Sequence, residues 1–166
     1  MMKPNQIIEQ INKSLPGSIE EQTEYRDELQ IYVNKEFFPE LMKLLRNEKA
    51  FNYDLLLDVA GIDRLPDVPR FELAYVLFSL DHNSRLIVKL KVDISDTVPS
   101  MTGIWKSADW PEREVYDLLG INFSDHPDLR RILTWDNFEG HPLRKDFPLK
   151  GKDFDKKFDP DTIKVY

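Results

Sequence analysis

Residues 71–92, FELAYVLFSLDHNSRLIVKLKV, contain the clearest strand signal in the chain. Residues 71–80 and 85–92 are two runs of apolar and β-branched side chains, and the polar segment between them is typical of a short hairpin loop. The second run places Lys89 and Lys91 between apolar positions, which indicates one face in water, whereas the first run is apolar on both sides. We therefore expect an antiparallel hairpin whose first strand is covered on both faces, either by the chain's own tail or by a partner.

The segments before this hairpin alternate between helical and strand periodicity. In chain order, the expected elements are a helix over 5–15, two strands over 19–34 with a turn near Arg26-Asp27, a helix over 37–47, a strand over 53–60 and a turn-rich linker over 61–70. Asn34 is the candidate cap of the second helix, and Pro39 would lie in its first turn, where a missing N–H costs least.

Residues 109–112, Asp-Trp-Pro-Glu, carry the pattern of a helix start. Asp109 is the expected cap, Glu112 would complete a capping box, and Gly120 is expected to end the helix in the left-handed conformation. Residues 121–166 then show little periodicity. Because such a long irregular segment is improbable inside a self-contained domain, we expect an extended arm that lies on another surface.

The whole chain has 166 residues, a formal net charge of -7 and no cysteine. Its length suits one domain with a core that needs no disulfide. The lack of cysteine excludes thiolate nucleophiles and cysteine-ligated zinc or iron–sulfur centres, and the acidic balance argues against a general nucleic-acid binder. No run approaches the roughly 20 apolar residues of a membrane-spanning helix. The N-terminal residues show no signal or presequence pattern, so we expect a cytoplasmic bacterial protein.

The charged helix near residue 112 holds the candidates for acid–base chemistry. Glu112 and Glu114 point about 200° apart around a helix axis, so they cannot easily share a substrate. Arg113 and Asp117 are four residues apart and can pair. On spacing alone, the simpler interpretation is a charged helix surface exposed to solvent.

The three histidines are His82, His126 and His141, and they form no spacing typical of a metal site. His126 and His141 each precede a proline, which favours a role in a turn or cap. The glycines form no nucleotide-binding pattern, and no serine lies in a GxSxG frame.

Residues 126–152 hold six Lys or Arg against four Asp or Glu, a local charge of +2 in an acidic chain. Guanidinium groups suit carboxylates and carbonyls on a facing surface. We therefore expect Arg130, Arg131 and Arg144 to pair with acidic or carbonyl groups of a protein partner. A phosphate-bearing ligand is a weaker alternative, because no glycine-lined cradle accompanies these cations.

Two motifs in this region, EREVYDLLGINFSDHPDLRRIL at 112–133 and EGHPLRKDFPL at 139–149, resemble the signature of the respiratory complex I 30-kDa subunit, which is the C subunit of bacterial NADH-quinone oxidoreductase. Residues 98–111, VPSMTGIWKSADWP, fit the same family, so the likeness covers most of the chain. The first hundred residues alone would not identify it. Asp125 stands where the family usually has glycine, so the turn there should avoid a conformation that only glycine tolerates.

The resemblance makes the motif residues candidates for contact with a partner protein, with no catalytic, cofactor-binding or metal-binding residue among them. These residues are Glu112, Arg113, Glu114, Asp117, Gly120, His126, Pro127, Leu129, Arg130, Arg131, His141, Pro142, Arg144, Lys145 and Asp146.

The resemblance also implies a fold and a function. The implied fold is α+β, a mixed and largely antiparallel sheet with helices mainly on one face and an extended C-terminal arm. The implied function is that of a non-catalytic scaffold in the peripheral arm of a proton-translocating NADH:quinone oxidoreductase, in which this chain holds the 49-kDa-like D subunit. FMN, iron–sulfur clusters and the ubiquinone or other quinone site would then belong to partner subunits. This chain would bind no cofactor or nucleic acid and would reach the cytoplasmic side of the cell membrane only through the complex.

We expect three parts along the chain: a sheet domain over 1–98, a motif helix and connection over 99–125 packed on it, and a partner-binding arm over 126–166. Phe154 and Phe158 are spaced as on one face of a helix, which allows a short helix in the tail. Three alternative functions are the equivalent subunit of a membrane-bound hydrogenase or another quinone- or phenazine-reducing complex, an independent small-molecule enzyme that uses the residues 112–114, and a free regulatory or chaperone-like binding module.

Overall fold

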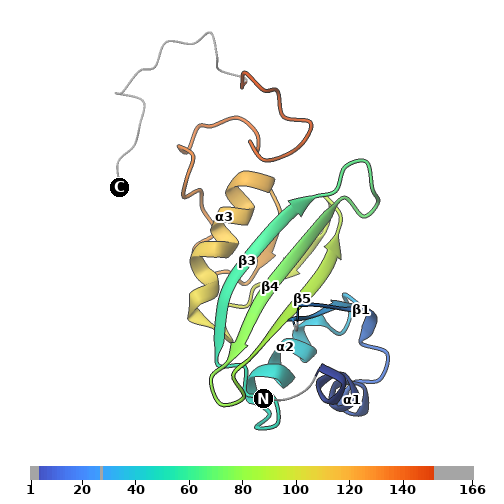
Figure 1. Cartoon of the computed structure of the whole chain (residues 1–166). Helices are drawn as coiled ribbons and strands as arrows, with labels where there is room; N and C mark the ends of the chain where they lie inside the picture. The colour runs from blue at the N-terminus through green and yellow to red at the C-terminus, as the bar shows by residue number, and fades with distance from the viewer. Residues whose placement is uncertain (1–3, 27, 152–166) are drawn as a thin grey trace.

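The computed structural model describes residues 4–26 and 28–151, which form a five-stranded mixed sheet with three α-helices and a small two-stranded sheet (Figure 1). The elements are α1 (Pro4–Ser14), β1 (Ile19–Tyr25), β2 (Glu28–Val33), α2 (Phe38–Asn47), β3 (Leu55–Asp63), β4 (Phe71–Ser79), β5 (Ser84–Val92), β6 (Thr97–Pro99), the 3-10 helix η1 (Lys106–Ala108), α3 (Asp109–Leu119) and β7 (Asn122–Ser124). This arrangement confirms the predicted α+β class.

The strands of the main sheet follow the order β1-β2-β5-β4-β3. The predicted hairpin is confirmed, since β4 and β5 pair antiparallel from Phe71 opposite Val92 to Ser79 opposite Ser84. The sequence did not predict that β2 joins β5 in parallel, with Leu29 opposite Leu86. A parallel pair needs a long crossover between its strands. Here α2, β3 and β4 supply that crossover, and β3 is left at the edge of the sheet.

One face of β4 forms the centre of the core. The side chains with no exposed surface on that face are Phe71, Leu73, Tyr75 and Leu77. The helix α2 covers this face where the rings of Phe38 and Tyr75 lie 5.0 Å apart. The helix α3 covers the same face beside β3, where Val115 and Leu119 pack against Gly61. The helices therefore lie mainly on one face, as the resemblance implied.

The other face of β4 is only partly covered by the described residues. Val76 and Phe78 on this face are half-buried, although Ala74 is buried. The prediction that β4 is covered on both faces therefore holds only in part within residues 4–26 and 28–151. The C-terminal tail was one expected source of this cover, and the spacing of Phe154 and Phe158 would allow a short helix there. Residues 152–166 lie outside the described part of the chain.

The first residues of α2 and α3 differ from the capping predictions. Asn34 is not the cap of α2, because its side chain accepts the N–H of Glu36 before the helix begins, whereas Pro39 does lie in the first turn. The helix α3 begins at Asp109 directly after η1, with no side-chain cap. The predicted capping box is wrong because the carboxylate of Glu112 turns inward and binds other donors.

The strand β3 runs further than the sequence predicted, from Leu55 to Asp63 instead of 53–60. Gly61 was assigned to a linker, but it lies within the strand opposite Leu73 of β4. A Cβ atom at Gly61 would overlap the side chain of Leu119 and would lie 3.3 Å from Val115. Any larger residue here would displace the side chain of Leu119, so glycine permits the close approach of α3 to the sheet.

We predict that Gly61→Val lowers the free energy of unfolding by about 1 to 3 kcal/mol, because the new side chain overpacks the contact between β3 and α3. Urea denaturation followed by circular dichroism would measure the loss. Gly103→Ala is the matched control, since a Cβ at Gly103 meets nothing within 4 Å. Equal stability of the two variants would contradict the packing described here.

Candidate partner-binding site

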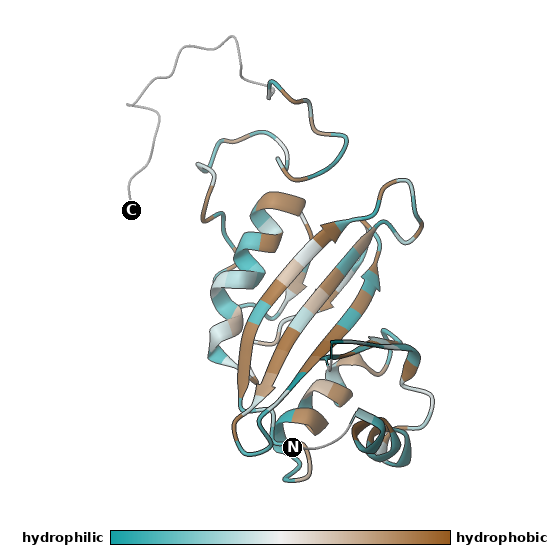
Figure 2. Ribbon diagram, viewed as in Figure 1, coloured by the Kyte–Doolittle hydropathy of each residue, from teal (hydrophilic) through white to brown (hydrophobic). Residues whose placement is uncertain are grey.

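The charged side chains of α3 are mostly buried. Glu112 and Asp117 have no exposed surface and Arg113 is 9% exposed, whereas Glu114 is exposed. Figure 2 shows the mixture of hydrophilic and hydrophobic residues along this helix. The interpretation of α3 as a charged, solvent-exposed helix is therefore wrong. Since buried charges are costly unless they are paired and hydrogen-bonded, each of them must have partners.

The carboxylate of Asp117 binds the beginning of the arm. Its Oδ2 accepts the backbone N–H groups of Ile132, Leu133 and Thr134 at 3.0, 2.8 and 2.8 Å. Its Oδ1 accepts Nη1 of Arg131 at 2.6 Å and also the hydroxyl of Thr134. Burial alone would raise the pKa of Asp117, but the hydrogen bonds from Thr134, Ile132 and Leu133 outweigh it and lower the pKa to about 2. The carboxylate is therefore a stable anion that fixes three consecutive residues of the arm.

The C-terminal end of α3 holds the next part of the arm. Arg144 Nε donates to the carbonyl of Leu119 at 2.6 Å, and the N–H of Leu143 donates to the carbonyl of Leu118 at 3.0 Å. His141 Nδ1 contacts the carbonyl of Asp117 at 2.9 Å. These donors satisfy carbonyls that a helix end leaves without partners. The arm thus serves as the C-terminal cap of α3.

Gly120 is required at this helix end for two reasons. Its φ is 74°, as the prediction of a left-handed cap required. In addition, a Cβ atom there would overlap the side chains of His141 and Arg144. Burial lowers the pKa of His141 and of Arg144.

The cation that pairs with Asp117 differs from the one that the sequence suggested. Arg113 donates to the carbonyls of Arg130 and Arg131, both at 3.2 Å, and its guanidinium lies 5.7 Å from the centre of the Trp110 ring. Helical spacing predicted that Arg113 pairs with Asp117, but the side chain that pairs with Asp117 is Arg131. Arg131 also donates to the carbonyl of Gly140 at 3.0 Å. This hydrogen bond closes the loop formed by residues 131–140.

A second buried carboxylate holds the arm at residues 145 and 146. Asp63, at the end of β3, accepts Nε and Nη2 of Arg70 at 3.0 and 2.7 Å and the N–H of Lys145 at 2.8 Å. Arg70 continues to Asp146, at 2.7 and 3.0 Å. The hydrogen bond from Arg70 holds the pKa of Asp63 well below its ordinary value. Asp63 and Arg70 were not predicted as site residues, because nothing in the pattern of residues 61–70 indicates partners about eighty residues away.

The beginning of the arm follows the small sheet, in which β6 and β7 pair in parallel. Glu112 accepts the N–H of Met101 at 2.7 Å and the hydroxyl of Ser100 at 2.6 Å, and burial raises its pKa. His126 Nε2 lies 3.1 Å from the carbonyl of Asp109. Asp125 has a φ of 58°, so the backbone does enter the left-handed region there, which aspartate tolerates better than most residues.

The predicted motif residues thus fall into three groups. Bound to the chain itself are Glu112, Arg113, Asp117, His126, Arg131, His141, Arg144, Lys145 and Asp146. Gly120, Leu129 and Pro142 are half-buried, Leu129 against the core. Glu114, Pro127 and Arg130 are exposed, and Arg130 pairs with Asp128 at 2.9 Å. The structure does not bring Glu112, Arg113 and Glu114 to one point, as an enzyme using all three would need.

Between the two carboxylates, the arm exposes large apolar side chains. Leu133 is 62% exposed, Leu143 58% and Trp135 47%. The rings of Trp135 and Phe138 meet edge to face at 4.9 Å, and Phe138 stacks on Phe147 at 5.8 Å. Large exposed apolar patches often mark interaction sites, so these side chains of one segment are candidates for such a site. We call Leu133, Trp135 and Leu143 the arm surface.

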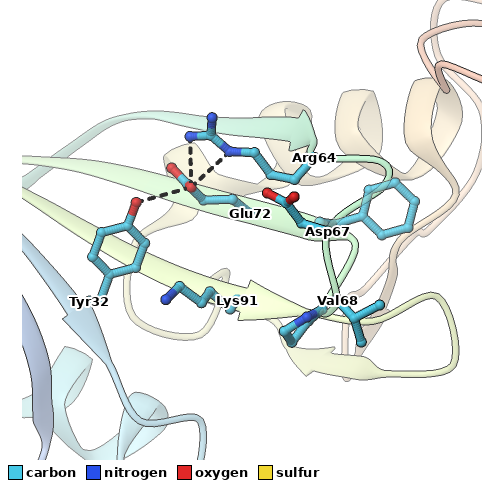
Figure 3. A pocket seen from close by; sticks show the side chains of 8 residues that line it. Tyr32, Arg64, Asp67, Val68, Glu72 and Lys91 are labelled. Atoms are coloured by element: carbon cyan, nitrogen blue, oxygen red, sulfur yellow. Dashed lines mark hydrogen bonds and ion pairs between the residues drawn. The ribbon is translucent and has the colours of Figure 1, made fainter.

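A separate hollow of about 550 Å³ lies beside Glu72 on the outer face of the sheet. Figure 3 shows Tyr32 and Arg64 directed at the Glu72 carboxylate, which accepts the Tyr32 hydroxyl at 3.1 Å and Arg64 Nη2 at 2.8 Å. Lys89 Nζ lies 3.1 Å from the same carboxylate. Its charge is therefore compensated within the chain. No group of side chains suited to a metal ion occurs within residues 4–26 and 28–151, and no helix among them is long and apolar enough to cross a membrane.

Fold and site together define an α+β domain that binds its own irregular arm through two buried carboxylates and leaves an apolar surface on that arm. Residues 31–153 match the sequence family described as "Respiratory-chain NADH dehydrogenase, 30 Kd subunit". The chain belongs to this family, so the family assignment made from the two motifs is confirmed.

A curated relative and one solved structure agree with the assignment, and a second solved structure shows a likeness of the fold alone. The chain is 42% identical over 154 residues to the NADH-quinone oxidoreductase C subunit of Geotalea uraniireducens, covering 92% of this chain and 93% of that protein. A structure described as "Nqo5 of the trypsin-resistant fragment (1-134)" is 32% identical, with a TM-score of 0.66 over 77% of this chain and all of that one. A chain of an archaeal membrane-bound sulfane sulfur reductase shares the fold, with a TM-score of 0.77 and 24% identity over 99% of this chain and 100% of that one.

We predict that Asp117→Asn lowers the free energy of unfolding by about 3 kcal/mol, because an amide cannot accept all the donors that meet there and leaves Arg131 without its anion. The variant should also be cleaved by protease within residues 131–146 much faster than the wild type. Asp136→Asn is the matched control, because Asp136 is an exposed residue of the same loop. Unchanged stability and cleavage in Asp117→Asn would contradict the role given to this carboxylate.

Stability should also depend on acid pH. Because the pKa of Asp117 is lowered from its ordinary 3.8 to about 2, its contribution of about 2 kcal/mol is complete above pH 4 and is lost as the pH falls toward 2. Asp63 acts in the same direction. Urea denaturation at a series of pH values would measure this loss, and Asp117→Asn should show a shallower dependence. An identical slope in wild type and variant would exclude this assignment.

Proposed function

We propose that this chain is a non-catalytic scaffold subunit in the peripheral arm of a proton-translocating NADH:quinone oxidoreductase. Family membership and the likeness to a C subunit of NADH-quinone oxidoreductase support the complex. The observation that carries the scaffold role is the arm surface, in which Leu133, Trp135 and Leu143 are exposed on a segment fixed at both ends. This surface binds the 49-kDa-like subunit and so helps to keep its position relative to the redox groups of other subunits.

The intrachain bonds of two arginines change which residues we propose for that contact. Arg131 and Arg144 were expected to pair across the interface, but both bind α3 of their own chain. They act on the partner only through the shape of the arm. The contact itself then falls to the apolar arm surface, which has the type of side chain that dominates interface cores.

Under this proposal, the chain binds no redox group and contacts the membrane only indirectly. FMN, the iron–sulfur clusters and the quinone site belong to other subunits, and this chain has no activity of its own. It reaches the cytoplasmic face of the membrane through the complex. The equivalent role in a membrane-bound hydrogenase or another quinone- or phenazine-reducing complex is less well supported, because the curated relative described above is a C subunit of NADH-quinone oxidoreductase. The likeness to the archaeal sulfane sulfur reductase is at 24% identity and concerns the fold alone.

Replacing Leu133 and Trp135 by alanine should lower the amount of this chain recovered in the assembled complex by about tenfold or more, as loss of two central contacts does. The isolated variant should keep its circular dichroism spectrum and its midpoint of unfolding. Affinity purification of the tagged chain from native membranes, with quantitative mass spectrometry of the other subunits, would measure recovery.

The matched control for this experiment is Leu80→Ala with Ile94→Ala, because both residues are also exposed and neither belongs to the arm surface. Normal assembly and normal quinone reductase activity of the arm variant would contradict the proposed function. Turnover or a bound chromophore in the purified chain would favour an independent enzyme instead, and a stable chain recovered without other subunits would favour a free binding module.

A further inference from the structure

A small groove lies between the edge strand β3 and the helix α3, with about 140 Å³ of free volume. Figure 1 shows α3 running beside β3 over much of its length. The residues that line the groove are Asp58, Val59, Ala60, Gly61, Glu114, Val115, Leu118, Leu119 and Leu143. Its lining is apolar except for two carboxylates, one contributed by the strand and one by the helix.

The two carboxylates of the groove differ from the other acidic groups of this region. Asp63, Glu72 and Asp117 are buried and paired with arginine or lysine. Asp58 and Glu114 are exposed, and within the part of the chain that the structure describes neither forms an ion pair. The hydrogen bond at Asp58 comes from the N–H of the next residue. The groove therefore carries two negative charges that the described chain does not neutralise.

The size of the groove limits what it can hold. Pockets for drug-sized ligands usually enclose about 300 to 1,000 Å³, and this groove is well below that range. It has room for a single apolar side chain. A side chain on a neighbouring polypeptide fits both the volume and the apolar lining.

The groove is continuous with the arm surface. Leu143 belongs to both, and its backbone N–H is bonded to the carbonyl of Leu118 in the groove wall. A polypeptide that covers Leu143 therefore reaches the groove as well. Two further exposed leucines, Leu55 and Leu57, lie on β3, the strand that forms the other wall.

We propose that this groove binds one apolar side chain of the neighbouring subunit, on a segment that carries lysine or arginine on both sides of that side chain. The inference rests on the proposed function, because it assigns the occupant to the same partner as the arm surface. Basic residues on the segment face Asp58 and Glu114, which gives the contact its specificity, since an acidic segment is repelled by both.

A charge variant of the full-length chain in its own cells tests this proposal. Asp58→Asn with Glu114→Lys changes the charge by three units, and the asparagine keeps an oxygen that can accept the N–H of Val59. Glu36→Gln with Glu24→Lys makes the same change in charge at exposed positions outside the groove. Recovery in the assembled complex should fall about tenfold for the groove variant and stay normal for the control. Normal recovery of the groove variant would overturn the inference.

Photo-crosslinking identifies the occupant. A photoreactive phenylalanine analogue at Leu118 should capture a peptide in which an apolar residue has lysine or arginine within about three positions on each side, from the same subunit that an analogue at Trp135 captures. A captured acidic peptide, or capture at Trp135 with none at Leu118, would overturn this inference and leave the proposed function intact. Absence of capture at both positions, with normal assembly of the arm variant, would contradict the proposed function itself.

Discussion

The burial of one carboxylate, Asp117, determines how residues 131–144 are arranged. A carboxylate with no exposed surface needs several donors, and the arm supplies them from three consecutive backbone N–H groups, a hydroxyl and the guanidinium of Arg131. The same contact turns the chain so that His141 and Arg144 reach the C-terminal end of α3. Removing that anion would leave these donors buried without an acceptor.

The second carboxylate, Asp63, completes the constraint by fixing Lys145, the other end of the loop that begins at Arg131, to the strand β3. An irregular loop held at two ends loses much of its freedom before it meets a partner, so less ordering entropy opposes binding. This arrangement explains how large side chains such as Trp135 can be exposed without a regular element beneath them. Under the proposed function, a partner would meet an apolar surface that already has its shape.

Local patterns predicted most of the regular elements, because the period of apolar residues reports which side of a helix or strand is buried. Gly120 was also predicted as a helix end, from its place after the apolar stripe of α3. The parallel contact of β2 with β5 and the bonds of Asp63 to Lys145 and of Arg70 to Asp146 join residues far apart in the chain, so no local pattern contains them. The inward turn of Glu112 and Asp117 was missed for the same reason, since their donors come from other segments. Motif resemblance marked Asp117 and Arg131 as important but gave them a partner outside the chain.

Hydrogen exchange of the isolated full-length chain, resolved to single amides by nuclear magnetic resonance, tests the central claim most directly. The amides of Ile132, Leu133 and Thr134 should exchange at least about a hundredfold more slowly than an unstructured peptide, as amides bonded to a buried carboxylate do. Exchange of these three amides at the rate of an unstructured peptide, while the amides of α3 remain protected, would show that the arm takes its shape only on the partner and would contradict the account.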